Sequence, residues 1–191
     1  MAQRTAFTKE MIASAAYELT REQGWVGVTA RNIARKLQSS TMPLYSSLGS
    51  MEAIAGEVRT RAETCMQGYQ RRSFSADPML NAAVGYVVFA RDEKHLFRFL
   101  YVDQPLTLTR SPGQREKPGL ARDAVTLGGV VDLMDQAATA MQDPRVLKSW
   151  AFSHGLASLI SSSVIDLPDE RIASLLLEMG AAIYGQKGGM S

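Results

Sequence analysis

The chain has 191 residues, 46% of them hydrophobic, and carries 21 Lys and Arg against 19 Asp and Glu, which gives a formal net charge of +2. Such a chain can bury a sizeable core, either as one domain or as a small domain beside a larger one. No apolar run approaches the roughly 20 residues of a transmembrane helix, no signal-peptide pattern follows Met1, and a single cysteine, Cys65, excludes an intrachain disulfide. We therefore expect a cytoplasmic protein with no membrane partner.

The first predicted element is an amphipathic helix over residues 8–23, which Gly24 stops. Its apolar residues recur at helical spacing and form one stripe: Met11, Ile12, Ala15, Ala16 and Leu19. Two short helices follow, joined by a tight turn. Thr29 is the expected N-cap of the first, Gln38 and Ser39 break its pattern, and Ser40 is placed to cap the second. Two helices this short suit a helix-turn-helix whose second helix lies in the DNA major groove.

Further helices are expected through the rest of the chain, and no segment carries a strand pattern. Gly49 ends one helix and Ser50 caps the next. The expected helices span residues 52–72, 92–101, 120–141, 143–164 and 167–185, with a loop over 104–118. A further helix is expected to begin at Pro78 and to direct Leu80, Val84, Val87 and Val88 inward. The pattern predicts an all-α protein.

The first 55 residues or so carry apolar, capping and turn residues in one register. These are Ile12, Ala15, Ala16, Leu19, Gly24, Thr29 to Ala34, Leu37, Ser40, Leu44, Tyr45 and Ser50 to Ile54. In this register the segment resembles the N-terminal domain of TetR-type transcriptional regulators. The later segment Trp150-Ala-Phe-Ser-His-Gly155 is similar to the signature of the WHG-type C-terminal subgroup, and 97–101 lies where that subgroup has an apolar helix. The resemblance implies a three-helix DNA-binding domain at 1–52 and a roughly six-helix ligand-binding and dimerisation domain at 53–191.

The resemblance also assigns DNA contacts. Thr41 offers a hydroxyl to a base edge or phosphate, and Met42 and Pro43 can pack on a thymine methyl. Tyr45, Thr29 and Arg31 match positions that meet phosphates, which position a protein without reading sequence. The predicted DNA-binding residues are Arg4, Thr8, Thr29, Arg31, Ser39, Ser40, Thr41, Met42, Pro43, Leu44, Tyr45, Ser46 and Ser47. Lys9 could add a contact beside Thr8. Residues 1–72 hold ten Lys and Arg against six Asp and Glu, which fits phosphate contact, although chance also produces so small an excess.

Four positions depart from the family pattern. Gln38 replaces a turn glycine, Ser47 and Leu48 replace the usual His-Phe, and Met51 replaces a lysine that commonly contacts phosphate. Fewer phosphate contacts weaken binding and flatten its salt dependence. The alternative is therefore a helical ligand-binding or adaptor protein with a degenerate head that does not bind DNA.

An aromatic and methionine-rich set on the later helices predicts an apolar ligand pocket, with a plain core as the other interpretation of each residue. Its members are Met66, Tyr69, Tyr86, Phe89, Phe97, Tyr101, Val130, Met134, Trp150 and His154. His154 either orients a ligand or is a satisfied core histidine. A small-molecule effector bound here would favour a state whose two heads no longer match the operator half-sites, and would release a repressor.

The last two helices predict a homodimer interface, because a palindromic operator requires a two-fold partner. The expected interface residues are Leu156, Leu159, Ile160, Ile172, Leu175, Met179 and Ile183. Burial of both faces inside one chain is the alternative.

No metal-ligand spacing, nucleophile motif or phosphate-binding glycine loop is present, so we expect no cofactor, no metal and no enzyme activity. The sequence thus predicts a transcriptional repressor that binds double-stranded operator DNA.

Overall fold

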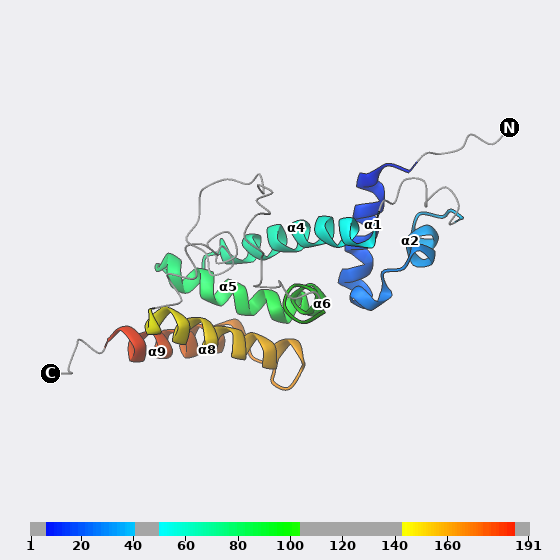
Figure 1. Cartoon of the computed structure of the whole chain (residues 1–191). Helices are drawn as coiled ribbons and strands as arrows, with labels where there is room; N and C mark the ends of the chain where they lie inside the picture. Colours follow the sequence, from blue (N-terminus) through cyan, green and yellow to red (C-terminus); the bar gives the residue numbers. More distant parts are fainter. Residues whose placement is uncertain (1–6, 41–49, 104–142, 186–191) are drawn as a thin grey trace. The chain divides into compact units, whose positions relative to one another are not determined.

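The computed structural model describes residues 7–40, 50–103 and 143–185, and within these ranges its regular structure is helical, without strands (Figure 1). The α-helices are α1 (Lys9–Gln23), α2 (Ala30–Lys36), α4 (Met51–Gln70), α5 (Pro78–Asp92), α6 (Lys94–Arg98), α8 (Pro144–Ser161) and α9 (Asp169–Tyr184). A 3-10 turn, η1 (Trp25–Gly27), and a π-helical turn, η2 (Phe99–Asp103), complete the set. The predicted all-α class is confirmed for this part of the chain. The helices predicted over 40–47 and 120–141 and the loop over 104–118 fall on residues outside it.

The described helices include none that is both long and apolar enough to cross a membrane. They pack into two units. Residues 7–40, 50–65 and 93–103 form the head unit, and residues 66–92 and 143–185 form the body unit. The sequence places a domain boundary after residue 52, whereas packing assigns the first part of α4 and all of α6 to the head unit. The reason is that α1 contacts both: Arg61 of α4 donates to Glu10 and Ser14, and α6 packs against α1.

The start and end of α1 follow from its sequence. The Thr8 Oγ1 accepts a hydrogen bond from the Met11 N–H at 3.1 Å, as an N-cap does. Gly24 ends the helix with φ of +78°, a conformation that glycine adopts without strain. The apolar stripe of the helix is buried in the head unit, apart from the partly exposed Met11.

The short helix α2 is held by a cap, a turn and an ion pair. The Thr29 Oγ1 accepts from the Asn32 N–H at 3.1 Å, as predicted, and the Asn32 amide donates to the Gly27 carbonyl at 2.8 Å. After α2, Gln38 has φ of +52°, the left-handed conformation that a turn glycine would take. Lys36 pairs with Glu22 at 2.8 Å and with Glu18 at 3.0 Å, so α2 is tied to α1 by charge as well as by packing.

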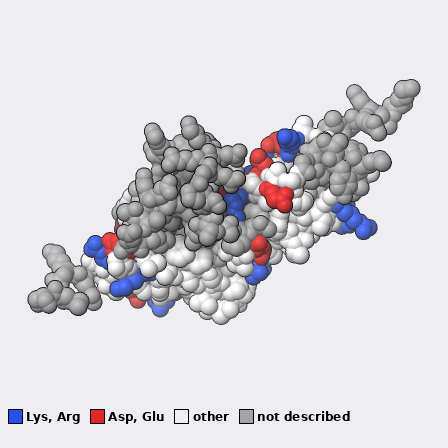
Figure 2. Space-filling view, in the orientation of Figure 1, with Lys and Arg blue, Asp and Glu red and all other residues white. Residues whose placement is uncertain are grey.

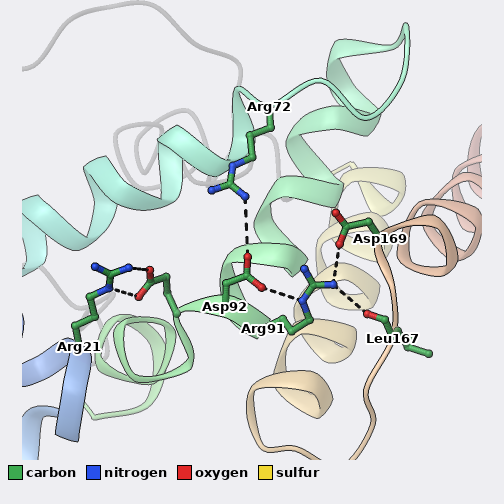
Figure 3. A network of polar contacts seen from close by, with 7 residues as sticks. Arg21, Arg72, Arg91, Asp92, Leu167 and Asp169 are labelled. Carbon is green, nitrogen blue, oxygen red and sulfur yellow. Dashed lines mark hydrogen bonds and ion pairs between the residues drawn. The ribbon is translucent and has the colours of Figure 1, made fainter.

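A buried carboxylate joins α1 to the start of α6. Glu93 accepts from the Arg21 Nε at 2.7 Å and from a second guanidinium nitrogen (Figure 3). The Glu93 side chain is 5% exposed and that of Arg21 is 56% exposed. A buried carboxylate is stable only while it is paired.

Arg21→Ala is therefore expected to lower the free energy of unfolding by about 2 kcal/mol, since it leaves the Glu93 charge without its partner. Chemical denaturation followed by circular dichroism measures the change. The double variant Arg21→Ala/Glu93→Met should recover most of the loss, because it removes the buried charge as well. Arg171→Ala, which breaks an exposed pair with Glu178, is the control and should change little. Equal losses of stability in Arg21→Ala and Arg171→Ala would show that the burial of Glu93 does not determine the loss.

The body unit is built from α5, α8 and α9, which pack against one another (Figure 1). Asp143 caps α8 by accepting from the Arg145 N–H at 2.8 Å. We predicted that this helix ends near Val164, but it ends at Ser161, because Ser163 turns the chain with φ of +59°. The core side chains of the unit come from all three helices and include Val84, Val87, Phe89, Ala157, Ile160, Ile172 and Leu176.

Polar contacts fix the ends of α5. At its end, Arg91 pairs with Asp169 at 2.7 Å and donates to the Leu167 carbonyl at 3.1 Å, which joins α5 to the start of α9 (Figure 3). At its start, the Asn81 Oδ1 accepts from the N–H groups of Phe74 and Ser75 at 2.9 and 2.7 Å. These bonds order the connection from α4 to α5.

Candidate functional site

The predicted DNA-binding residues are only partly described. Thr8, Thr29, Arg31, Ser39 and Ser40 lie in the head unit. Arg4 and the residues of the predicted major-groove helix Thr41, Met42, Pro43, Leu44, Tyr45, Ser46 and Ser47 fall outside the described ranges.

The exposed surface of α2 carries two arginines one turn apart. Arg31 and Arg35 are both exposed, and neither has an ion-pair partner among the described residues. Lys36 differs, since it forms ion pairs with Glu22 and Glu18, and its hydrogen bonds to these two carboxylates raise its pKa. Thr29, which is also exposed, accepts the capping bond and keeps its hydroxyl hydrogen for another acceptor. The exposed surface of α2 therefore offers two arginines that form no ion pair with a described residue, together with the Thr29 hydroxyl at the N-cap. Sequence analysis missed Arg35, although its i+4 spacing from Arg31 was the signal for it.

In the body unit, an aromatic cluster is formed by Tyr86 of α5 with Trp150 and His154 of α8. The Tyr86 hydroxyl lies 2.8 Å from the His154 Nδ1, and the Trp150 and His154 rings stack 5.0 Å apart with 9° between their planes. Tyr86 is buried and His154 is half-buried. Burial lowers the pKa of His154, so the imidazole is neutral at pH 7 and presents one donor and one acceptor.

The other described members of the predicted ligand set lie in both units. Met66, Tyr69 and Phe89 are buried in the body unit, where the Tyr69 and Phe89 rings meet edge to face at 5.6 Å. Phe97 and Tyr101 belong to the head unit, where their rings contact each other at 5.0 Å. Val130 and Met134 lie outside the described residues.

A buried amide that sequence analysis missed lies at the end of α4. Gln70 is 3% exposed, and neither its Oε1 nor its Nε2 has a hydrogen-bond partner among the described residues. Buried polar groups are nearly always hydrogen-bonded, so such a pair of atoms needs an explanation. Nothing in the sequence distinguishes this glutamine from a polar residue in the solvated last turn of a helix.

His154 makes the stability of the protein depend on pH. Its pKa is lowered in the folded state, so between that value and the usual one near 6.5 the unfolded state binds more protons. The free energy of unfolding is therefore expected to fall as the pH drops below about 6.5, by at most about 1.4 kcal/mol per pH unit. Urea titrations from pH 8 to pH 5 measure the slope. His154→Gln, which keeps a polar group for Tyr86, should flatten the profile in this window, and an unchanged slope would exclude His154 as its source.

The residues of the predicted dimer interface differ in their burial within the single chain. Leu156, Ile160 and Ile172 are buried in the unit formed by α5, α8 and α9. Leu175, Met179 and Ile183 are half-buried and Leu159 is exposed. Apolar side chains outside the prediction are exposed on or next to α8 and α9 as well, among them Leu147, Val164, Leu177 and Tyr184. The chain has no Asp, Glu, Lys or Arg from 149 to 165, and Figure 2 shows an uncharged surface over much of α8.

No model of a known protein family matches the chain, and no curated protein or solved structure matches it. Within the described ranges, no group of three or more His, Cys, Asp or Glu side chains is placed to hold a metal ion. The function is thus argued from three features of the described chain: the basic surface of α2, the interior of the body unit and the uncharged surface of α8.

Proposed function

We propose that the protein is a sequence-specific DNA-binding transcriptional regulator of the TetR type. In this proposal it is a dimeric repressor that a small, largely apolar ligand releases from its operator. The observation that carries the proposal is α2 itself, a short capped helix with a left-handed turn after it. Its surface presents two arginines that no acidic residue of the described chain engages.

The packing of the head unit supports this function. Lys36 ties α2 to α1 and Arg61 ties α4 to α1, so the segment between α2 and α4 begins and ends on anchored helices. This segment holds the residues from Thr41 to Ser47, which we assign to the helix that enters the major groove. Arg31, Arg35 and Thr29 would contact the flanking phosphates and set the register of that helix on the duplex.

The body unit supports the dimeric and ligand-binding parts of the proposal. The exposed apolar side chains of Leu159 and Leu177, on α8 and α9, are those that a second copy would cover. The aromatic cluster supplies a neutral imidazole and a buried hydroxyl among apolar side chains, as binding sites for small molecules commonly do. Ligand bound to one of two dimer states shifts the population toward that state, and the spacing of the heads then no longer fits the half-sites.

The test is selection of genomic DNA fragments by the purified protein, followed by gel shift of the enriched fragments and of the DNA that flanks its own gene. We expect one palindromic site to be enriched, with saturable binding that weakens as salt increases and that only the same site competes. Binding equal on all fragments, or absent from all, would overturn the proposal and favour the ligand-binding or adaptor protein without a functional head. Light scattering at micromolar concentration tests the dimer.

A further inference from the structure

The amide of Gln70 is held in the interior by the backbone around it. A Cβ atom on Gly85 of α5 would lie 2.6 Å from the Gln70 Cα and 2.3 Å from the Tyr69 carbonyl oxygen. The end of α4 therefore lies directly against α5. Gln70 follows the buried Met66 by one turn, so the helix directs its side chain to the apolar stripe rather than to solvent.

The described buried residues near Gln70 in the chain and on α5 are apolar, and the partly exposed Arg72 places its guanidinium 3.6 Å from the centroid of the Tyr69 ring. Tyr69, its neighbour in the chain, meets Phe89 edge to face, and Ala82, one turn before Gly85 on α5, is buried as well. A charged group in such surroundings would require a buried counter-charge, and none of the described residues buried there carries one. The amide itself offers one acceptor oxygen and a nitrogen with two donors. Its complement is a neutral group that carries a donor and an acceptor side by side.

We propose that Gln70 is the polar contact of a binding site for an uncharged ligand that contains a primary amide or a lactam. The ligand's carbonyl accepts from the Gln70 Nε2, and its N–H donates to the Gln70 Oε1. A carboxylate has no donor and would leave the Oε1 unpaired, while a hydrocarbon would leave both atoms unpaired, and each omission weakens binding. This inference rests on the ligand-binding part of the proposed function and specifies the chemistry that the site recognises.

Two fragments serve as probes, benzamide and the lactam 2-pyridone, with benzoate and toluene as controls that lack the complete donor and acceptor pair. Calorimetric titration of the full chain should show benzamide or 2-pyridone bound at least tenfold more tightly than either control. Gln70→Leu should lower the affinity for the bound probe at least tenfold. Gln67→Leu, which replaces a half-buried glutamine in the same helix, should leave that affinity unchanged.

The inference would be overturned if neither probe bound, or if a probe bound equally well to the wild type and to Gln70→Leu. If neither probe bound, water would be the hydrogen-bond partner of the Gln70 amide. Gln70→Met provides a second apolar variant should the leucine variant not fold, and the comparison of benzamide with benzoate needs no variant. Gel shift with and without the bound probe separates this inference from the proposed function. Probe binding without operator binding would contradict only the regulator, and operator binding without probe binding would contradict only the inference.

Discussion

Gly85→Ala is expected to lower the free energy of unfolding by about 3 kcal/mol, the largest loss of stability that we predict for a single methyl group. The added Cβ would lie 2.3 Å from the Tyr69 carbonyl oxygen, and real Cβ atoms do not approach this closely. The atoms that would have to move are backbone atoms of Tyr69 and Gln70, not the end of a flexible side chain. Separation of α4 from α5 would also loosen the packing around Phe89, so overpacking and weaker dispersion attraction act together. Denaturant unfolding followed by circular dichroism gives the change in free energy.

The matched control is Gly68→Ala, which lies two residues before the end of the same helix, α4. A Cβ at Gly68 meets nothing within 4 Å. Alanine favours the helix over glycine, so this variant should be as stable as the wild type or up to about 1 kcal/mol more stable. Similar losses in the two variants would show that the close approach of α4 to α5 is not maintained in solution.

Local signals in the sequence predicted most of the described helix boundaries. Thr29 caps α2 and Asp143 caps α8, as expected, because each supplies an oxygen to the backbone N–H groups next to it in the chain. Gly24 ends α1 for an equally local reason. The end of α8 was predicted three residues too late, since Ser163 adopts a left-handed conformation that serine rarely takes and that no residue type announces.

Contacts between distant residues were beyond sequence patterns. Tyr86 and His154 are 68 positions apart, and only the packing of α5 against α8 brings them to hydrogen-bond distance. Phe97 and Tyr101 share the aromatic composition of the predicted ligand set, yet they belong to the head unit. Composition identifies side chains suited to an apolar interior, but it carries no information about which of them meet. The burial of the Gln70 amide likewise depends on the close approach of two backbones.

The double variant Arg31→Gln/Arg35→Gln is expected to weaken binding to each operator half-site roughly 100-fold, because removal of each of the two phosphate contacts in that half-site costs about 1.4 kcal/mol. Both side chains lie on the exposed surface of α2, and neither is engaged by an acidic residue of the described chain. Their charges are therefore available to DNA without breaking an ion pair there. Stability should be unchanged, because exposed polar substitutions on a helix rarely alter it by more than about 0.5 kcal/mol.

The salt dependence distinguishes removal of phosphate contacts from damage to the head. Titrations of the operator across salt concentrations should give a logarithmic slope smaller in magnitude by about 0.9 for each phosphate that the variant no longer neutralises. Affinity should fall equally for operator and unrelated DNA, since phosphates do not encode sequence. Lys94→Gln/Lys148→Gln removes the same two charges from exposed positions outside α2 and should leave both affinity and slope nearly unchanged. If this control flattened the slope equally, net charge rather than the surface of α2 would account for DNA binding. Arg31 and Arg35 would then not be the phosphate contacts that we propose.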